Sequence, residues 1–170
     1  RTEHRETLYA AWNRAIELAK GEYITNANTD DRHRFDALEL MANYLDQHSD
    51  IAVVYGDQLI THNPNETFAN TQANQRWNWP DFSYQELERR CCLGSQPMWR
   101  KSLHQKYGDF NPEFTVAGDY EFWLRIGKTE NIAKIPEILG LYFDNQDGLE
   151  NKNPTTYTET QKICQQYGIV

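Results

Sequence analysis

The sequence predicts an α/β domain in which helices cover a partly parallel sheet. The chain has 170 residues, the usual size of one domain, and 39% of them are hydrophobic, which is enough to form a core. Helical and strand patterns alternate along the chain, and this alternation is typical of strand–helix–strand units. We therefore expect residues 1–170 to fold as a single domain.

The first part of the chain contains two helical patterns and two strand patterns. Apolar residues recur at helical spacing over residues 8–19 and again over residues 35–45. Lys20 and Gly21 form a good stop for the first helix. A short strand is expected at residues 23–25 and a longer one at 50–55. Gly56 and Asp57 interrupt the longer strand, and residues 58–61 could continue it.

The middle of the chain, about residues 63–90, is predicted to be a long irregular segment. It is polar and rich in asparagine, yet it contains Trp77, Trp79, Phe82 and Tyr84. A loop of this length in a compact domain is usually functional or disordered. Its aromatic rings could stack on the faces of sugars or could pin the loop to the core, and the sequence leaves both interpretations open.

Regular patterns return after this segment. We expect helices at residues 100–107, 119–126 and 155–167, and two short strands at 132–135 and 138–143. Gly108 is placed to end the first of these helices, and Pro136 separates the two strands.

Charge and cysteine content exclude some classes of protein. The net charge is −8, from 25 acidic and 17 basic residues, which argues against nucleic-acid binding. No apolar run in the chain is long enough to cross a bilayer. The three cysteines, Cys91, Cys92 and Cys164, lack zinc-ligand spacing, and their odd number favours a reducing compartment. We expect a cytoplasmic protein and leave membrane association and oligomeric state open.

The stretch "EYITNANTDDRHRF" places oxygen-rich side chains at the end of a predicted strand. Asn28, Asp30 and Asp31 follow the strand directly. Open α/β sheets bind ligands at the carboxyl ends of their strands, and these oxygen donors suit Mg²⁺ or Mn²⁺. Arg32 and Arg34 could then bind a phosphate through bidentate hydrogen bonds.

The same stretch is also compatible with a purely structural role. Asp31 could be the N-cap of the following helix, with Asp30 close to the positive end of its dipole. Spacing alone slightly favours this interpretation.

A second group of charged residues lies in "AGDYEFWLRIG", residues 117–127. Asp119 follows Gly118 at the expected helix start, where a carboxylate beside a pocket could be a general base. Glu121 and Arg125 are spaced to form an ion pair along the helix, and Asp119 and Trp123 share another face. Helix capping and a surface ion pair would explain the same pattern.

Five segments resemble, in the same order, the family 2 glycosyltransferases, which have a GT-A fold. They are "AAWNRAIELAKGEYITNANTDDR", "YGD", "PMWRKSLHQKYGDFNPEF", "GDYEFWLRI" and "IPEILGLY". The resemblance extends from about residue 8 to residue 142. It implies a partial GT-A-like α/β fold, with a mixed, mostly parallel sheet flanked by helices.

The resemblance also implies roles for individual residues. Asp30 matches the aspartate that holds the divalent ion, Mn²⁺ or Mg²⁺, on the diphosphate of the sugar nucleotide. Asn28 replaces the first aspartate of the family's Asp-x-Asp motif, which should weaken ion binding. Asp119 matches the catalytic base, although Gly118 replaces the preceding glutamate. The resemblance assigns substrate binding to Asn28, Asp31, Arg32, Glu121, Trp123 and Arg125.

The implied reaction is inverting transfer of a sugar from a nucleotide-diphosphate sugar to a hydroxyl of a sugar or glycan acceptor. The family's "V-S-V-I-I-P-x-Y-N" and "V-V-D-D-G-S" segments, which build its nucleotide pocket, have no match here. We therefore expect the C-terminal two-thirds of a GT-A domain, with little transferase activity by itself. The alternative is a non-catalytic module of the same fold that binds a protein partner or a glycan.

Overall fold

The computed structural model describes residues 4–169, apart from the side chain of Glu150. The helices in this range are α1 (Leu8–Leu18), α2 (Ala37–Gln47), α3 (Tyr84–Arg89), α4 (Ser102–Tyr107), α5 (Gly118–Gly127), α6 (Leu149–Lys152) and α7 (Thr156–Tyr167). The strands are β1 (Tyr23–Thr25), β2 (Arg32–His33), β3 (Ile51–Thr61), β4 (Gln75–Trp77), β5 (Met98–Arg100) and β6 (Asn131–Phe143). The predicted helices at 8–19, 119–126 and 155–167 and the strand at 23–25 are confirmed to within two residues.

The strands form one mixed sheet with the order β1-β5-β3-β6-β2, and β4 also pairs with β3. Only β3 and β6 pair in parallel among the described strands, so the prediction of a mostly parallel sheet is wrong. The reason lies in β5, which runs antiparallel between β1 and β3. The strands β1 and β3 do run in the same direction, as a strand–helix–strand unit requires, but they are not neighbours.

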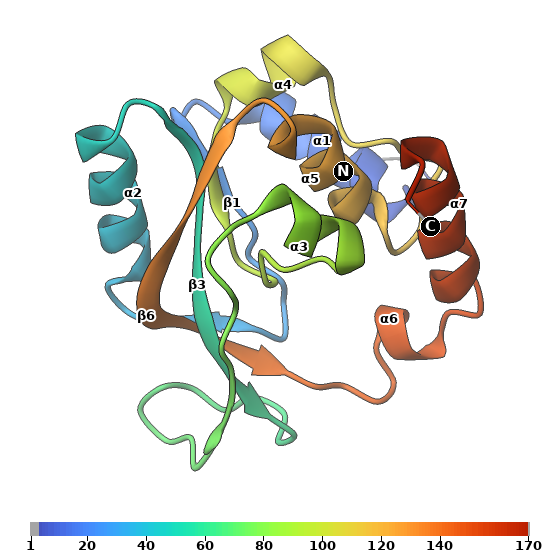
Figure 1. Cartoon of the computed structure of the whole chain (residues 1–170). Helices are drawn as coiled ribbons and strands as arrows, with labels where there is room; N and C mark the ends of the chain where they lie inside the picture. Colours follow the sequence, from blue (N-terminus) through green and yellow to red (C-terminus); the bar gives the residue numbers. More distant parts are fainter. Residues whose placement is uncertain (1–3, 170) are drawn as a thin grey trace.

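Two long, curved strands form the centre of the sheet (Figure 1). Strand β3 continues through Gly56 and Asp57, where its register against β6 shifts, so the predicted break is an irregularity within one strand. The backbones approach closely at this point, and only glycine fits, since a Cβ on Gly56 would lie 2.6 Å from Cγ of Leu139. Pro136 likewise falls at an irregular point of β6 and does not divide it, because no ladder hydrogen bond is needed there.

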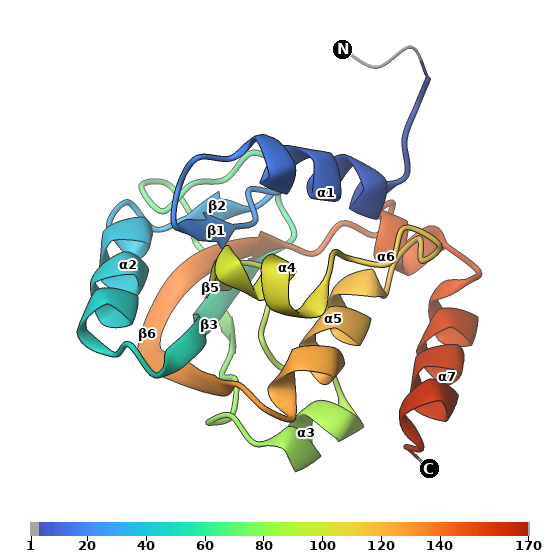
Figure 2. The ribbon, with the colours of Figure 1, turned by 90° about the horizontal axis from the view of Figure 1, so that it is seen from above.

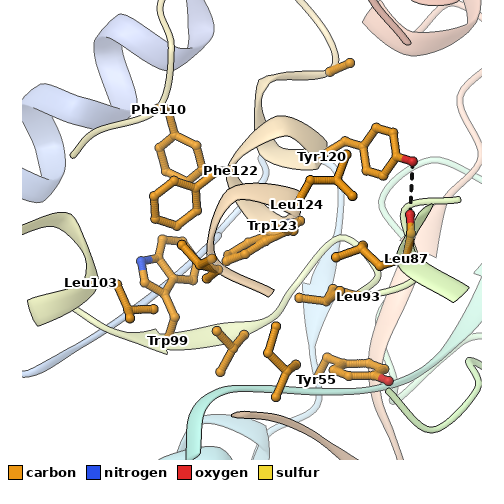
Figure 3. Close-up of a cluster of buried hydrophobic side chains, with 14 of the residues drawn as sticks. Tyr55, Leu87, Leu93, Trp99, Leu103, Phe110, Tyr120, Phe122, Trp123 and Leu124 are labelled. Carbon is orange, nitrogen blue, oxygen red and sulfur yellow. Dashed lines mark hydrogen bonds between the residues drawn. The ribbon is translucent and has the colours of Figure 1, made fainter. Parts of the chain in front are cut away.

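Helices cover both faces of the sheet, with α2 on one side and α3, α4 and α5 on the other (Figures 1 and 2). The second side has an aromatic core in which Trp123 meets Trp99 edge to face, with ring centroids 5.4 Å apart. Phe110 and Phe122 belong to the same cluster, as Figure 3 shows, with ring centroids 4.6 Å apart. Phe110 also meets the ring of Trp12 from α1, at 5.5 Å between centroids. Such edge-to-face pairs stabilise a core beyond the area that they bury.

Three local predictions are corrected by the structure. Helix α2 begins at Ala37, and Phe35 is 95% exposed, so Phe35 is not part of its buried stripe. The N-cap of α2 is Asp36, whereas Asp31 precedes the unpredicted strand β2, so Asp31 is not a helix cap. The segment 63–90 is only partly irregular, because it contains β4 and α3.

None of the three cysteines forms a disulfide in the structure. Within residues 4–169, no helix has the length and apolar character needed to cross a membrane.

Candidate functional site

A cleft of about 750 Å³ opens between the loop after β1, the start of α5 and the segment after β6. It brings together Asn28, Asp30, Asp31 and Asp119, which lie about 90 residues apart in sequence at their extremes. Arg32, Glu121, Trp123 and Arg125 do not line it. The loop after β1 and the segment 117–127, which the sequence analysis treated separately, therefore both contribute to one cleft. Only some of the predicted residues of each segment line it.

The loop after β1 is fixed by its buried aspartate. The carboxylate of Asp31 is 5% exposed and accepts hydrogen bonds from the backbone N–H of Phe143 and from Nδ2 of Asn28, each at 3.0 Å. Burial raises the pKa of Asp31, and these two hydrogen bonds oppose that rise. Asp31 thus ties the loop to the end of β6, while its neighbour Asp30 stays exposed at the cleft.

The geometry of this loop limits how it could hold a metal ion. No group of three or more histidine, cysteine or acidic side chains is placed to hold an ion within the described residues. The exposed carboxylate of Asp30 is nevertheless compatible with Mg²⁺ or Mn²⁺, because these ions keep several waters and bind one or two carboxylates together with substrate phosphates. Since the amide nitrogen of Asn28 is used by Asp31, its carbonyl oxygen is the atom that Asn28 can offer. The donor set fits an ion shared with a diphosphate.

Asp119, which also lines the cleft, lies in the first turn of α5. Its Oδ1 accepts hydrogen bonds from the Tyr9 hydroxyl at 3.0 Å and from the Tyr120 backbone N–H at 2.9 Å. Burial raises the pKa of Asp119, and the two hydrogen bonds only partly counter it. A carboxylate of raised pKa that still reaches a cleft is suited to take up a proton.

The residue before Asp119 must be small. A Cβ on Gly118 would lie 2.7 Å from Cδ2 and Cε2 of the Tyr9 ring, which packs flat against this turn. The glycine that departs from the family's Glu-Asp pair therefore accommodates Tyr9, the residue that holds Asp119. The sequence reasoning missed Tyr9, because its partner is 110 residues away and its position in α1 resembles that of any core residue.

Beyond Tyr120, the side chains of α5 do not line the cleft. Glu121 is 4% exposed, pairs with Nη2 of Arg125 at 2.6 Å and accepts a hydrogen bond from the Tyr167 hydroxyl at 2.7 Å. The predicted ion pair between Glu121 and Arg125 is therefore confirmed. Trp123 is buried in the aromatic core. The side chains of Glu121, Trp123 and Arg125 therefore contact other protein groups.

The two arginines after the loop also have protein partners. Nη1 of Arg32 donates to the backbone oxygen atoms of Asp31 and Thr29, at 2.7 Å and 3.2 Å. Arg34 pairs with Asp36 and Glu137. A cation that the sequence analysis did not single out, Arg90, lines the cleft instead.

Aromatic rings form one wall of the cleft. The ring of Trp77 lies 4.7 Å from that of Tyr142 and 5.3 Å from that of Trp79, measured between centroids. The buried carboxylate of Asp57 holds this wall, because it binds Arg76, Lys134 and the backbone N–H of Trp79. The segment is therefore fixed to the sheet and its two tryptophans line the cleft, while stacking of these rings on sugars stays a prediction.

Comparison with known proteins places the chain in a family. Residues 1–108 match the model of the family described as "Glycosyl transferase family 2", so the chain belongs to this family. The loop after β1 lies within the matched residues, whereas Asp119 lies beyond them.

Similar proteins are consistent with this membership. A hyaluronan synthase of Pasteurella multocida is 28% identical, over 86% of this chain and 15% of its own length. A PGL/p-HBAD biosynthesis glycosyltransferase of Mycobacterium bovis is 26% identical, over 87% of this chain and 56% of its own length. The chain therefore spans 15% of the length of the first of these relatives and 56% of the length of the second.

A solved structure confirms the fold. The structure of S. aureus TarS residues 1–349 in complex with UDP-GlcNAc superimposes with a TM-score of 0.74 and 13% identity, over 99% of this chain and 48% of that one. The predicted GT-A-like α/β fold is thus confirmed, and the chain corresponds to part of such a domain.

Proposed function

We propose that this chain supplies the base and part of the donor site of an inverting glycosyltransferase, which moves a sugar from a nucleotide-diphosphate sugar to an acceptor hydroxyl. One observation supports this most directly: the Asn28–Asp31 loop and Asp119 line the same cleft. A diphosphate at the loop and a hydroxyl at Asp119 would place the reacting sugar between them. Membership in the glycosyltransferase family is consistent with this arrangement.

In the proposed reaction, Asp119 accepts the proton of the acceptor hydroxyl as that oxygen attacks the anomeric carbon. A new bond forms between this carbon and the acceptor oxygen, and the bond to the departing diphosphate breaks on the opposite side, which inverts the configuration. Such proton transfer contributes about 10²–10⁴-fold to a rate. The hydrogen bond from Tyr9 orients the carboxylate, and leaves Oδ2 of Asp119 available for the acceptor.

Asp30, together with the carbonyl oxygen of Asn28, would hold Mn²⁺ or Mg²⁺ at the cleft. Such an ion supplies Lewis-acid neutralisation of the charge that develops on the diphosphate. Because the donor set is small, we expect the protein residues alone to bind the ion weakly. Glu121, Trp123, Arg125 and Arg32 have no part in this proposal, since the structure gives them other partners.

The test of this function is Asp119→Asn in the full-length protein. Asparagine keeps the shape and can still accept from Tyr9, but it cannot take the proton, so we expect turnover to fall by about 10²–10⁴-fold with little change in melting temperature. Glu121→Gln is the control, and we expect it to lower the melting temperature and leave turnover of the folded enzyme largely intact. Near-wild-type turnover in Asp119→Asn together with its loss in Glu121→Gln would assign the base to Glu121. Wild-type turnover in both would place the base at another residue, whereas no turnover by the unmutated full-length protein would favour the non-catalytic module.

A further inference from the structure

The turn before α5 is held by a carboxylate from the far end of the chain. Helix α7 runs alongside α5 at the side of the domain away from α2 (Figures 1 and 2). Its Glu159 reaches into the turn and accepts three backbone hydrogen bonds, from Thr115 at 2.8 Å, Val116 at 2.9 Å and Ala117 at 3.0 Å. The side chain of Glu159 is buried, with 6% of the residue exposed.

This arrangement is unusual for a buried acid. Burial works against the charge of Glu159, but the hydrogen bonds from Val116, Ala117 and Thr115 outweigh it and lower the pKa of this carboxyl. Hydrogen bonds to a charged group are stronger than neutral ones, and three of them converge on one side chain here. Glu159 is therefore ionised at neutral pH and fixes the positions of three consecutive peptide groups.

Those three peptide groups lead directly to Asp119. Ala117 is the N-cap residue of α5 and makes no capping hydrogen bond with its side chain. From the other side, the Tyr9 hydroxyl lies 2.6 Å from the backbone oxygen of Val116 and 3.0 Å from Oδ1 of Asp119, so that its single proton is shared between these two acceptors. The turn is thus held between α7 and α1, and Asp119 follows it by two residues. The neighbours of Glu159 on α7, Thr156 and Thr160, line the cleft.

We propose that Glu159 is the positioning residue for Asp119: by binding the N–H groups of Thr115, Val116 and Ala117, it fixes the turn from which α5 starts and aims the Asp119 carboxylate into the cleft. This inference rests on the proposed function in so far as Asp119 is the base. It assigns a role to α7, which lies beyond both the matched residues 1–108 and the resemblance that ends near residue 142. Glu159 itself is not in the cleft lining and does not contact substrate.

Helix α7 offers a matched control. Its other end is bound to α5 by the hydrogen bond from the Tyr167 hydroxyl to Oε1 of Glu121, at 2.7 Å. This contact also fastens α7 to α5, but it reaches the side chain of Glu121 and none of the three backbone N–H groups that Glu159 binds. If α7 acts only as packing, losing either contact should have the same effect on Asp119. If Glu159 positions Asp119, only the change at Glu159 should be felt there.

The first experiment measures the pKa of Asp119 by carboxyl ¹³C NMR, with the resonance assigned from Asp119→Asn. Burial is the largest influence on this carboxyl, so a loosened turn that admits water should lower its pKa. We expect Glu159→Gln and Glu159→Asp to lower it and Tyr167→Phe to leave it unchanged. Glu159→Asp keeps the negative charge but is one methylene too short, so it separates lost geometry from lost charge, and it serves as the test where Glu159→Gln does not fold.

The variants leave the other groups near Asp119 chemically unchanged. These groups are the Tyr9 hydroxyl from α1, the Tyr120 N–H from α5 and, in the lining of the same cleft, Asp30, Asp31 and Arg90. An unchanged Asp119 pKa in both Glu159 variants would overturn the proposal. So would an equal shift in Tyr167→Phe, because the effect would then belong to helix packing.

The second experiment measures kinetics in the full-length enzyme. Misplacing a reacting group by about 1 Å can cost about 10²-fold in rate. We expect Glu159→Gln to reduce kcat by up to about 10²-fold without changing KM for the nucleotide sugar, and Glu159→Asp to recover little of this loss. A rise in KM with unchanged kcat would contradict a positioning role. The NMR result does not depend on turnover. It can therefore overturn the positioning role of Glu159 while Asp119 remains the base, and kinetics can exclude Asp119 as the base while the NMR result stands.

Discussion

The loop after β1 and the first turns of α5 each contain two nearby carboxylates, and the protein treats the members of each pair differently. In the loop, Asp30 is exposed at the cleft, whereas Asp31 is buried and bound to Asn28 and Phe143. In α5, Asp119 reaches the cleft, whereas Glu121 is enclosed by Arg125 and Tyr167. In both regions one carboxylate secures the element and the other is left available for chemistry.

The two regions differ in how the available carboxylate is held. Asp30 is exposed, and the loop is fixed by its neighbour. Asp119 is held directly, by Tyr9 and the Tyr120 N–H, and burial raises its pKa. An exposed carboxylate suits a ligand for a hydrated ion, whereas a constrained one of raised pKa suits proton transfer. In the proposed function, the same residue type would therefore serve two purposes because the environments differ.

The largest expected effect is on the free energy of unfolding, and it distinguishes Glu121 from Asp119 in α5. Glu121→Ala removes the acid of a buried ion pair, which typically costs about 3–5 kcal/mol. We expect about 3 kcal/mol, the lower end, because Arg125 keeps its hydrogen bond to the Tyr107 backbone oxygen. Asp119→Ala should cost about 1 kcal/mol or less, since the Tyr9 hydroxyl keeps its bond to the Val116 oxygen.

Urea denaturation of both variants measures this difference. Equal losses in the two variants would mean that Asp119 is as structural as Glu121, and the contrast between them would disappear.

The next effect separates the two carboxylates of the loop. Asp31→Ala leaves the Phe143 N–H without its partner, and we expect a loss of about 1–3 kcal/mol in the free energy of unfolding. Asp30→Ala should leave stability unchanged but abolish Mn²⁺ binding. We expect wild type to bind Mn²⁺ weakly alone and more tightly with UDP or GDP, because phosphate oxygens fill the open ligand positions.

Titration of Mn²⁺ with and without each nucleotide tests this for wild type and Asp30→Ala. Equal binding by the two proteins would remove Asp30 from the site, whatever the stability of Asp31→Ala.

These contrasts mark what the sequence could and could not predict. Periodicity identified α1 from its apolar stripe. Helices α5 and α7 were also predicted, although α5 is buried on nearly all sides and α7 buries only Glu159 and Ile163. The analysis missed β2, β4 and β5, which have only two or three residues each, whereas the equally short β1 was predicted from its apolar and aromatic residues. It also predicted the wrong pairing for the sheet, because the position of β5 between β1 and β3 depends on contacts distant in sequence.

The candidate site shows the same division. The sequence identified Asp30 and Asp119 through motifs, since the residue types are local information. It could not decide which carboxylate of each pair is buried, because that depends on partners such as Phe143, 112 residues from Asp31. Tyr9 and Glu159, which hold Asp119 and its turn, were missed for the same reason. In the proposed function, the residues that contact a ligand are therefore easier to predict than the residues that hold those side chains in position.

The smallest expected effect is a pH dependence that distinguishes Asp119 from an ordinary surface aspartate. Because burial raises the pKa of Asp119, the folded state binds a proton that the unfolded state has already released. The contribution of Asp119 to the free energy of unfolding of the wild-type protein is therefore fully present below the unfolded pKa, about 3.9. It is lost as pH rises through the folded pKa. Asp119→Asn cannot titrate, so its stability relative to wild type should increase with pH across this window and then level off. Measuring unfolding free energies by urea at a series of pH values from acid to neutral tests the sign. A difference that stays constant, or that falls as pH rises, would show that Asp119 does not carry the raised pKa on which its proposed role as a base depends.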